Sequence, residues 1–394
     1  MEAPHLAGPL ECTACAACVA VCGKGALRPE FADDGHSYIV FDASRCVQCH
    51  ACEHVCPVVN ARGIGSNDIL ETQPLRGWSV QETYRQAGTS GGIFAALAHA
   101  FIAQGGVVVG ASLQSNHCRH ICIDKTDDIR LLQGSKYMYS SLVGIHGAMA
   151  RALHAGRPVL FSGLPCQVAG VLSYFAGDKD REKLYTIDLV CGGMPSALLI
   201  SQFLAQHPGE EILAFRSKEV YRLTCRRGDR TINHGKQNLV IGGLFSGLTF
   251  RPSCYNCPYA RAHRASDITL GDYWQPDPSN SRGVSLLLVH NARGHRLLSQ
   301  APVHTEAVAW RDFLPHNPKI AVGFTPWRGR WERTHMSAIL HMRSGYWRDL
   351  IFASAYKRYD PLALAYIVYR HLKGRIEKTR RRNEVNKILM LNNL

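Results

Sequence analysis

The chain has 394 residues, of which 46% are hydrophobic and 19% charged, and its formal net charge is +14. This composition excludes an intrinsically disordered or fibrous protein, and the length allows two or three domains with sizeable cores. We expect no membrane-spanning helix, because His99, Gln104 and the Gly105–Gly106 pair interrupt the most apolar window.

The fifteen cysteines fall in runs that are typical of metal ligands rather than of a disulfide framework. We find no export signal at the start of the sequence, since no basic residue precedes Lys24 and no apolar signal core is present. Metal-binding cysteines without an export signal indicate a reducing compartment, so we predict a cytoplasmic location.

Residues 1–63 contain eight of these cysteines in two runs of one pattern, about 34 residues apart. In each run three cysteines are separated by two residues, and a fourth follows after three more. The runs are Cys12, Cys15, Cys18 and Cys22, then Cys46, Cys49, Cys52 and Cys56. This spacing is that of a bacterial ferredoxin-like module with two 4Fe-4S clusters. Zinc and disulfides also use cysteines, but the duplicated run disfavours both.

The fourth cysteine of each run is predicted to bind the cluster of the other run. It opens a helix and therefore points away from the loop that carries its three neighbours. One cluster would then take Cys12, Cys15, Cys18 and Cys56, and the other Cys46, Cys49, Cys52 and Cys22. Proline follows Cys56 but Gly23 follows Cys22, which predicts a slightly looser cluster environment there.

Residues 64–82 are predicted to be a linker, and residues 83–325 alternate short apolar strands with helices. The strands are expected at 107–109, 157–161, 184–190 and 285–290, and the helices at 91–104, 166–175 and 196–205. This order predicts a mixed α/β core with a mixed or parallel sheet.

Four later cysteines could hold a third cluster. Cys166 and Cys191 each follow a predicted strand, and the carboxyl ends of neighbouring parallel strands meet at one edge of a sheet. Cys254 and Cys257 form a chelating pair, which completes four thiolates. The alternatives are buried structural cysteines, a redox-active pair or half of a zinc site. Cys118, Cys122 and Cys225 have no partner spacing and are expected to be core or surface thiols.

A turn of Thr89, Ser90, Gly91 and Gly92 precedes a long apolar helix. Its glycines allow a ligand to approach the backbone, and the helix N-terminus favours a phosphate; a simple helix cap is the alternative. A one-electron relay usually needs a flavin to couple it to two-electron chemistry. The sequence has no GxGxxG or Walker motif, so a standard dinucleotide fold is not supported.

Taken in order, the motifs of residues 1–295 resemble those of the beta subunits of coenzyme F420-reducing hydrogenases and related dehydrogenases. Besides the cysteine runs and the turn at Thr89, the matching segments are Gln133–Tyr137, Gly163–Gln167, Asp188–Gly193, Cys254–Pro258, Asp267–Trp274 and Arg282–Ser285. The resemblance implies an FAD and a 4Fe-4S cluster in an oxidoreductase core at residues 83–325. It also implies that Cys166, Cys191, Cys254 and Cys257 are the ligands of this third cluster.

The resemblance further implies which residues border the flavin. They are Thr89, Ser90, Gly91, Gly92, Gly134, Ser135, Lys136, Tyr137, Gly271 and Asp272. Lys136 and Asp272 are the candidates for a catalytic role, and Trp274 is the candidate for a wall of the site. Core packing of Tyr137 and Trp274 and a surface position for Lys136 remain the alternatives.

Residues 326–394 are predicted to be helical and basic, with eight bases between Arg370 and Lys387. Such a helix can contact a membrane surface or a partner, or simply be solvated. Nucleic acid is not an expected partner, since interleaved aromatic residues and a recognisable nucleic-acid fold are absent from the sequence.

These observations predict an iron–sulfur flavoprotein that exchanges a hydride with a small organic molecule. The electrons would come from a redox partner protein or a ferredoxin-type donor, and coenzyme F420 is the first candidate for the organic molecule. One alternative is an electron-relay subunit that docks on a catalytic partner. Another is a reductase of a tetrapyrrole or of a sugar-linked intermediate in a polysaccharide pathway.

Overall fold

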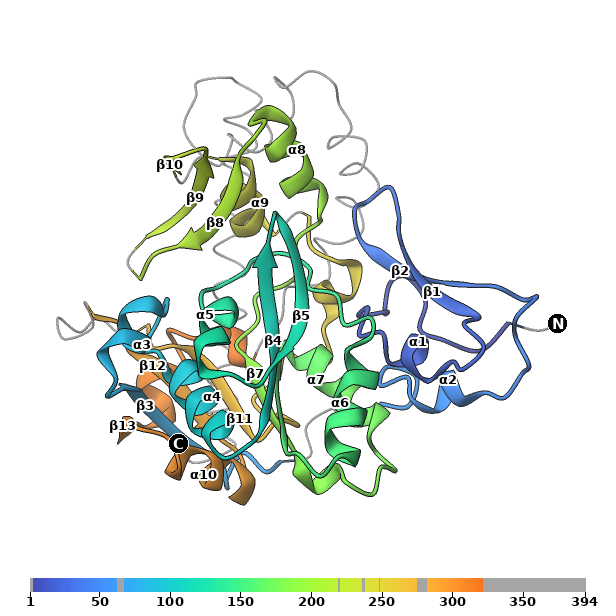
Figure 1. Ribbon diagram of the computed structural model, residues 1–394, viewed down its shortest axis with the longest axis horizontal. Coiled ribbons are helices and arrows are strands. Elements are labelled where there is room, and N and C mark those ends of the chain that lie inside the picture. Colours follow the sequence, from blue (N-terminus) through green and yellow to red (C-terminus); the bar gives the residue numbers. More distant parts are fainter. Residues whose placement is uncertain are drawn as a thin grey trace.

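The computed structural model describes residues 3–61, 67–218, 220–235, 238–247, 249–274 and 282–321. Figure 1 shows three parts: a small N-terminal module, a large sheet covered by helices, and a lobe built on a second, smaller sheet. The basic C-terminal region predicted at 326–394 lies outside the described residues. No helix in the part of the chain that the structure describes is long and apolar enough to cross a membrane.

The N-terminal module is built from two similar halves. Each half contributes a short strand and a short helix that follows a cysteine loop, and the two strands pair antiparallel. The elements are α1 (Ala17–Val21), β1 (Leu27–Phe31), β2 (Ser37–Phe41) and α2 (Ala51–His54). Strands β1 and β2 both lie between the two cysteine runs.

The large sheet has eight strands in the order β13-β3-β12-β11-β7-β6-β4-β5. Four neighbouring strands are parallel: β11 (Ile268–Asp272), β7 (Leu184–Leu189), β6 (Val159–Gly163) and β4 (Val107–Gln114). Antiparallel strands flank them: β5 (His117–Ile123), β12 (Ser285–Val289), β3 (Gln73–Ser79) and β13 (Val303–Ala307). The mixed α/β fold predicted from the sequence is confirmed.

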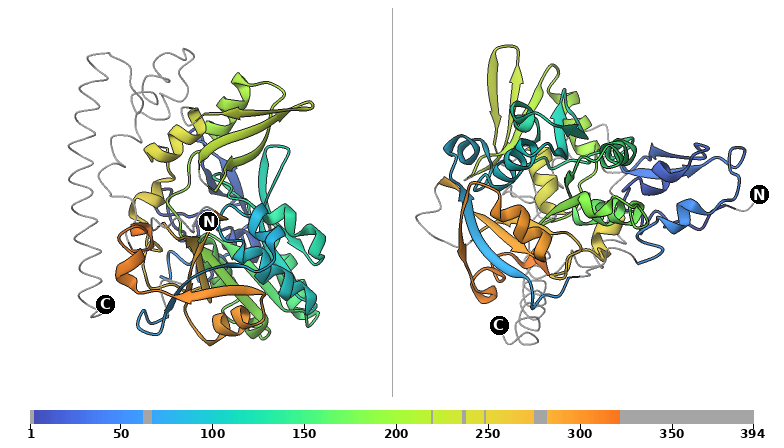
Figure 2. Two further views of the ribbon diagram at one scale, coloured as in Figure 1. Left: turned by 90° about the vertical axis from the view of Figure 1, so that its left-hand side faces the viewer. Right: turned by 60° about the horizontal axis from the view of Figure 1, so that its bottom comes forward.

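Helices cover both faces of this sheet, which explains why its central strands are apolar throughout. Successive residues of β6 point to opposite faces of the sheet and enter different cores. Leu160 packs in the core beneath α4 (Ile93–Ala103) and α10 (Ala292–Ser299). Phe161 packs in the core beneath α6 (Ile145–His154) and α7 (Pro165–Tyr174). Ala16 and Val19 of the N-terminal module join the second core. The module therefore packs beside α6 and α7 (Figure 2).

The lobe was not expected as a separate sheet. It contains β8 (Glu211–Arg216), β9 (Tyr221–Arg227) and β10 (Arg230–His234), all antiparallel, with α8 (Leu198–Gln206) and α9 (Leu239–Ser246). Phe203, Phe215, Leu223 and Ile241 form its core. Its core also packs against Leu113 of β4 and against Tyr137 and Met138, but most of the core residues belong to the lobe itself.

The segment predicted as a linker includes a strand of the large sheet. Residues 73–79 form β3, which pairs with β12 and with β13. Its side chains alternate between buried and partly exposed positions, with Leu75, Gly77 and Ser79 directed inward. A proline and a glycine within this short run weaken the strand pattern in the sequence. The remaining described helices are short: α3 (Glu82–Ala87), α5 (Ile129–Leu132) and α11 (Trp310–Phe313).

Candidate functional site

Four cysteines of the N-terminal module line one cavity, and one of them comes from the other run. They are Cys22, Cys46, Cys49 and Cys52. The Cys22 Sγ accepts the N–H of Ala26 at 3.3 Å, and the Cys46 Sγ accepts the N–H of Gln48 at 3.4 Å. The structure thus brings together the four residues predicted for the second cluster, with backbone donors directed at two of their sulfurs.

The other four cysteines of the module also lie near one another. Burial, together with the neighbouring Cys12 and Cys56, raises the pKa of Cys15 to about 12. The pKa of Cys18 is raised by burial and by Cys15, Cys12 and Cys56. Thiols crowded in this way ionise only when a positively charged group binds them, which fits an iron–sulfur cluster held by these four residues.

The backbone of the two cysteine loops has the same unusual conformation. Ala14 and Ala16 in the first loop have φ values of 55° and 59°, and Gln48 and His50 in the second have 53° and 56°. This left-handed region costs a residue with a side chain about 1–2 kcal/mol. Strain at equivalent positions on both sides of the middle cysteine indicates that the loops are shaped to wrap a ligand.

A second group of four cysteines lines a cavity in the large α/β part: Cys166, Cys191, Cys254 and Cys257. Cys166 lies in the first turn of α7, just after β6, and Cys191 follows β7. Since β6 and β7 are parallel neighbours, their carboxyl ends present both thiols at one edge of the sheet. Cys254 lies in a short 3₁₀ turn, and Cys257 follows it.

A buried arginine beside this cavity fits an anionic occupant. Arg264 is 2% exposed, and its Nε and Nη1 have no hydrogen-bond partner among the described residues. Nη1 lies 3.6 Å from a carboxylate oxygen of Asp188. Burial raises the pKa of Cys191 and of Cys257, and the Arg264 charge opposes this effect. A cluster with four thiolates is negatively charged overall, so this donor set fits it.

The N-terminal module contacts the rim of this cavity. The Arg251 Nε donates to the carbonyl oxygen of Cys12 at 2.6 Å, and its Nη2 donates to that of Ser37 at 2.6 Å. Tyr259 is 4% exposed, and its pKa is raised by burial and by the thiols of Cys166 and Cys15. Tyr259 therefore lies close to a cysteine of each group.

Gly170 allows the module to approach α7, the helix that carries Cys166. A Cβ atom at this position would lie 2.5 Å from the Cβ of Cys15 and 2.8 Å from its Sγ. We expect Gly170→Ala to destabilise the protein by about 1–3 kcal/mol through overpacking, although alanine favours a helix. Anaerobic thermal unfolding of the purified protein measures this change.

Gly147→Ala in α6 is the matched control, because the nearest atom to its new Cβ would be the Arg151 Nη1 at 3.7 Å. This variant should be neutral or more stable by up to about 1 kcal/mol. Equal stabilisation by both substitutions would mean that the module does not pack against α7 in solution.

Three segments predicted to border a flavin are joined by a chain of polar contacts. The Oγ atoms of Thr89 and Ser135 lie 2.8 Å apart, and the Arg216 Nε donates to the Ser135 Oγ at 3.2 Å. The Arg216 Nη2 then donates to both carboxylate oxygens of Asp272, at 2.8 and 2.9 Å. The side chain of Arg216 is only 3% exposed, and Gln133 has a buried Nε2 without a hydrogen-bond partner among the described residues.

The other predicted flavin contacts have local partners. The Lys136 amine donates to the carbonyl oxygens of Leu132, Gln133 and Gly134 at 2.7 to 3.1 Å, and burial lowers its pKa to about 8. It therefore stabilises the C-terminus of α5. The Tyr137 hydroxyl donates to that of Tyr221 at 3.4 Å, whereas the ring of Trp274 is half-exposed near Arg216.

Close packing requires three of the four glycines predicted to border the flavin. A Cβ at Gly91 would lie 2.5 Å from the carbonyl oxygen of Gly77, and one at Gly271 would lie 2.8 Å from the Cγ2 of Val190. Gly92 has a φ of 77°, and its new Cβ would lie 2.5 Å from the carbonyl oxygen of Tyr84. Gly134 has no atom within 4 Å of such a Cβ. The Ser90 Oγ donates to the carbonyl oxygen of Val284 at 3.0 Å.

Three arginines of these sites were not predicted from the sequence: Arg216, Arg251 and Arg264. A single arginine among the 45 basic residues carries no recognisable spacing signal. Arg251 is near the Cys254–Cys257 pair in the sequence, and this proximity is the only signal that could have indicated it.

Two family descriptions match separate parts of the chain. Residues 11–60 match a 4Fe-4S dicluster domain, and residues 156–309 match the carboxyl-terminal part of the beta subunit of coenzyme F420 hydrogenase/dehydrogenase. The chain is 26% identical over 284 residues to one of the subunits of the F(420)H(2) dehydrogenase of Methanosarcina mazei. This alignment covers 68% of this chain and 78% of that protein.

Two further similarities are more limited. The archaeal-type glutamate synthase [NADPH] of Thermotoga maritima is 34% identical over 84 residues, or 21% of this chain and 16% of the synthase. A chain of the F420-reducing [NiFe] hydrogenase complex from Methanosarcina barkeri matches with a TM-score of 0.47 and 15% identity, over 68% of this chain and 91% of that one.

The family resemblance predicted from the sequence motifs is confirmed by the matches over residues 11–60 and 156–309. The chain is an iron–sulfur electron-transfer protein with an N-terminal 4Fe-4S dicluster domain, and it is related to the beta subunit of coenzyme F420 hydrogenase/dehydrogenase.

Proposed function

We propose that the chain is an iron–sulfur flavoprotein oxidoreductase in which three 4Fe-4S clusters exchange electrons with an FAD. The observation that carries this proposal is the cavity lined by Cys166, Cys191, Cys254 and Cys257. It lies beside the N-terminal module on one side and next to the strand that ends at Asp272 on the other. The Val190 N–H, one residue before Cys191, donates to the carbonyl oxygen of Leu270 at 2.9 Å.

When bound, the clusters would carry single electrons, and the FAD would combine two electrons with protons so that a hydride can be exchanged with an organic molecule. The chain's own residues bind and orient these groups. Arg251 joins the backbone of Cys12 to the cavity rim, and Arg264 supplies positive charge to the thiolates of Cys191 and Cys257.

For the flavin we propose the polar group of Thr89, Ser135 and Arg216. A buried guanidinium next to two hydroxyls is suited to an anionic part of a cofactor, such as its diphosphate. Asp272 holds the guanidinium by two hydrogen bonds and so orients it. Lys136 takes a structural role in this proposal because its amine is occupied by three carbonyl oxygens.

The organic molecule that we propose is a deazaflavin, coenzyme F420. The similarity to one component of an F(420)H(2) dehydrogenase supports it over a tetrapyrrole or a sugar-linked intermediate. The name of that relative also supports a second candidate function, a relay subunit that passes electrons to a catalytic partner and binds no flavin.

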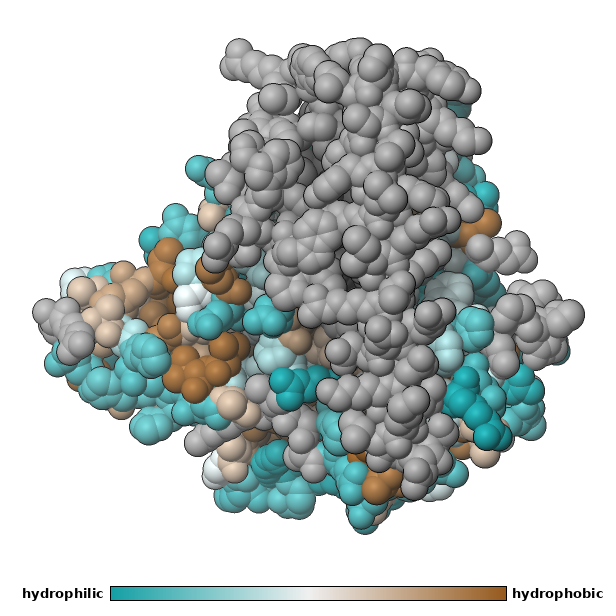
Figure 3. All heavy atoms as spheres, turned by 180° about the vertical axis from the view of Figure 1, so that it is seen from behind, coloured by the Kyte–Doolittle hydropathy of each residue, from teal (hydrophilic) through white to brown (hydrophobic). Residues whose placement is uncertain are grey.

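A redox partner protein would dock on the N-terminal module in either case. The module exposes Leu10, Phe31 and Val47, which are 59 to 62% exposed, and Figure 3 shows hydrophobic patches on its surface. Cys49, one of the four cysteines of the second cluster site, is itself exposed. Clusters near the surface favour electron exchange with a partner. The predicted cytoplasmic location and the predicted contact through the basic C-terminal region stay predictions.

Protein purified without oxygen is expected to contain about twelve irons, as three cubane clusters require, and about one FAD per chain. Its visible absorption should bleach with dithionite. Reduced protein should then reduce F420, and the product is followed by the change in deazaflavin absorbance. Full iron content without any flavin would favour the relay subunit, and eight irons would contradict the third cluster.

A further inference from the structure

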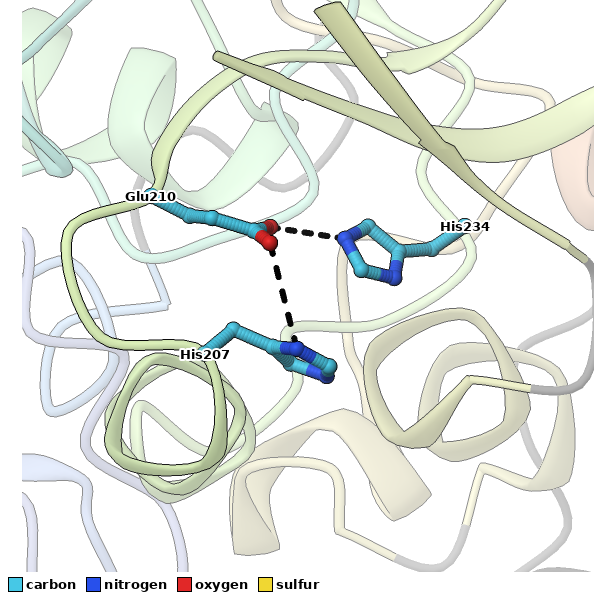
Figure 4. Close-up of side chains that lie close together, drawn as sticks. All are labelled: His207, Glu210 and His234. Atoms are coloured by element: carbon cyan, nitrogen blue, oxygen red, sulfur yellow. Dashed lines mark hydrogen bonds and ion pairs between the residues drawn. The ribbon is translucent and has the colours of Figure 1, made fainter. Parts of the chain in front are cut away.

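A group of two histidines and one glutamate lies in the lobe, away from the cysteine sites (Figure 4). His207 directly follows α8, Glu210 lies just before β8, and His234 is the last residue of β10. The Glu210 Oε2 lies 2.7 Å from the His234 Nε2, and its Oε1 lies 3.9 Å from the His207 Nδ1. The Glu210 side chain is 1% exposed, whereas those of His207 and His234 are 32% and 16% exposed.

The three side chains offer the donor atoms that zinc prefers. One ligand atom from each residue lies within 4.8 Å of the other two. The ligand atoms of a tetrahedral zinc ion are about 3.3 Å apart, given bonds of about 2.0 Å. Binding of an ion would therefore require the His207 nitrogen to move closer to Glu210 and the 2.7 Å separation of the Glu210 Oε2 and the His234 Nε2 to widen.

The surrounding residues hold the group in place. Asn116, at the tip of the hairpin between β4 and β5, donates to the carbonyl oxygen of Glu210 at 2.9 Å and accepts the N–H of Ile212 at 2.7 Å. The Phe203 ring packs against both imidazoles, with centroids 4.4 Å from His207 and 4.9 Å from His234. Asn116 therefore fixes the backbone around Glu210, and Phe203 fixes the two imidazole rings, before any ion binds.

The access to the group also suits a metal ion. A surface crevice lined by Ser115, Asn116, His207 and Glu210 opens the group to solvent. The Arg227 Nη2 now lies 2.9 Å from the Glu210 Oε1, but this side chain is half-exposed and can turn outward when a cation arrives.

We propose that His207, Glu210 and His234 bind one Zn²⁺, with a water molecule from the crevice at the fourth position. The ion would connect the end of α8 to the start of β8 and the end of β10. Asn116 ties the backbone around Glu210 to the large sheet independently of the ion. The competing arrangement is the metal-free one, in which Glu210 pairs with Arg227 and is hydrogen-bonded to His234 and Cys225.

The first test is the zinc content of the whole protein, purified without oxygen, incubated with ZnCl₂ and freed of excess metal. We expect about one zinc per chain, and loss of most of it in the double variant His207→Gln/His234→Gln, with the iron content unchanged. His304→Gln is the matched control, since this exposed histidine pairs with Glu306 outside the group. Zinc near background in the unaltered protein, or zinc retained by the double variant, overturns the proposal.

The second test identifies the ligands in the unaltered protein and so does not depend on the folding of a variant. The zinc K-edge X-ray absorption spectrum should contain a nitrogen and oxygen shell near 2.0 Å with the multiple scattering of two imidazoles. A shell of sulfur atoms near 2.3 Å would mean that zinc occupies the cysteine sites instead, and the proposal would fall.

Discussion

Cys254→Ala is expected to remove about a third of the iron while leaving the signals of the N-terminal clusters intact. Cys254 is one of four thiols around a single cavity, and its Sγ accepts the N–H of Met194 at 3.4 Å. A cubane cluster that loses one of four thiolates is poorly held, whereas the eight cysteines of residues 1–63 are untouched. Iron analysis and electron paramagnetic resonance after dithionite reduction measure both parts of this result.

Cys122→Ala is the control for that experiment, because Cys122 is an exposed cysteine on β5 outside all three groups. It should leave the iron content and the spectrum unchanged. An iron content that stays the same in Cys254→Ala would show that Cys254 is not a cluster ligand. A loss of all the iron would instead mean that the variant has unfolded, which thermal unfolding of the same sample detects.

Arg216→Gln is expected to lower the bound flavin by at least about tenfold with no loss of iron. The arginine is buried and links Ser135 to Asp272, so the neutral substitute removes the positive charge from the proposed diphosphate site. A loss of about 1.4 kcal/mol in binding already corresponds to tenfold. Flavin released by denaturation is measured by its fluorescence and compared with the iron content of the same sample.

Breaking a buried ion pair can also destabilise the fold by about 3–5 kcal/mol, so a second variant is needed. Asp272→Asn keeps the shape of the partner and leaves Arg216 charged, and it should retain more flavin than Arg216→Gln. Arg226→Gln is the matched control, since this arginine pairs with Glu211 on the exposed side of the lobe at 2.5 Å. Full flavin content in Arg216→Gln would exclude the proposed site.

The N-terminal cluster sites were largely predictable from the sequence because their geometry is local. Three cysteines at intervals of three residues wrap one loop, and the fourth reaches the loop of the other run. The cavity lined by Cys22 together with Cys46, Cys49 and Cys52 has this crossed composition. The meeting of Cys166 and Cys191 also followed from local signals, since each comes directly after a strand of a parallel pair.

Long-range packing decided the rest, and no spacing in the sequence encodes it. Arg216 and Asp272 are 56 residues apart, and they meet because the lobe folds back over the carboxyl end of β11. The first half of the lobe is joined to its second by hydrophobic burial of Phe203 and Ile241, which the pattern of either helix alone does not show.

Lys136 is a residue that a sequence motif indicated but whose contacts in the structure are all local. Its position in a family motif suggested a flavin contact, but its amine is nearest to carbonyl oxygens left unpaired at the end of α5. The sequence by itself determined which thiols form chelating runs and which strands are buried, because both depend on short, regular spacing. Only the tertiary structure decided which buried charges lie beside those thiols. The partner of a single charged side chain depends on which distant segments pack against it, and no local spacing encodes this packing.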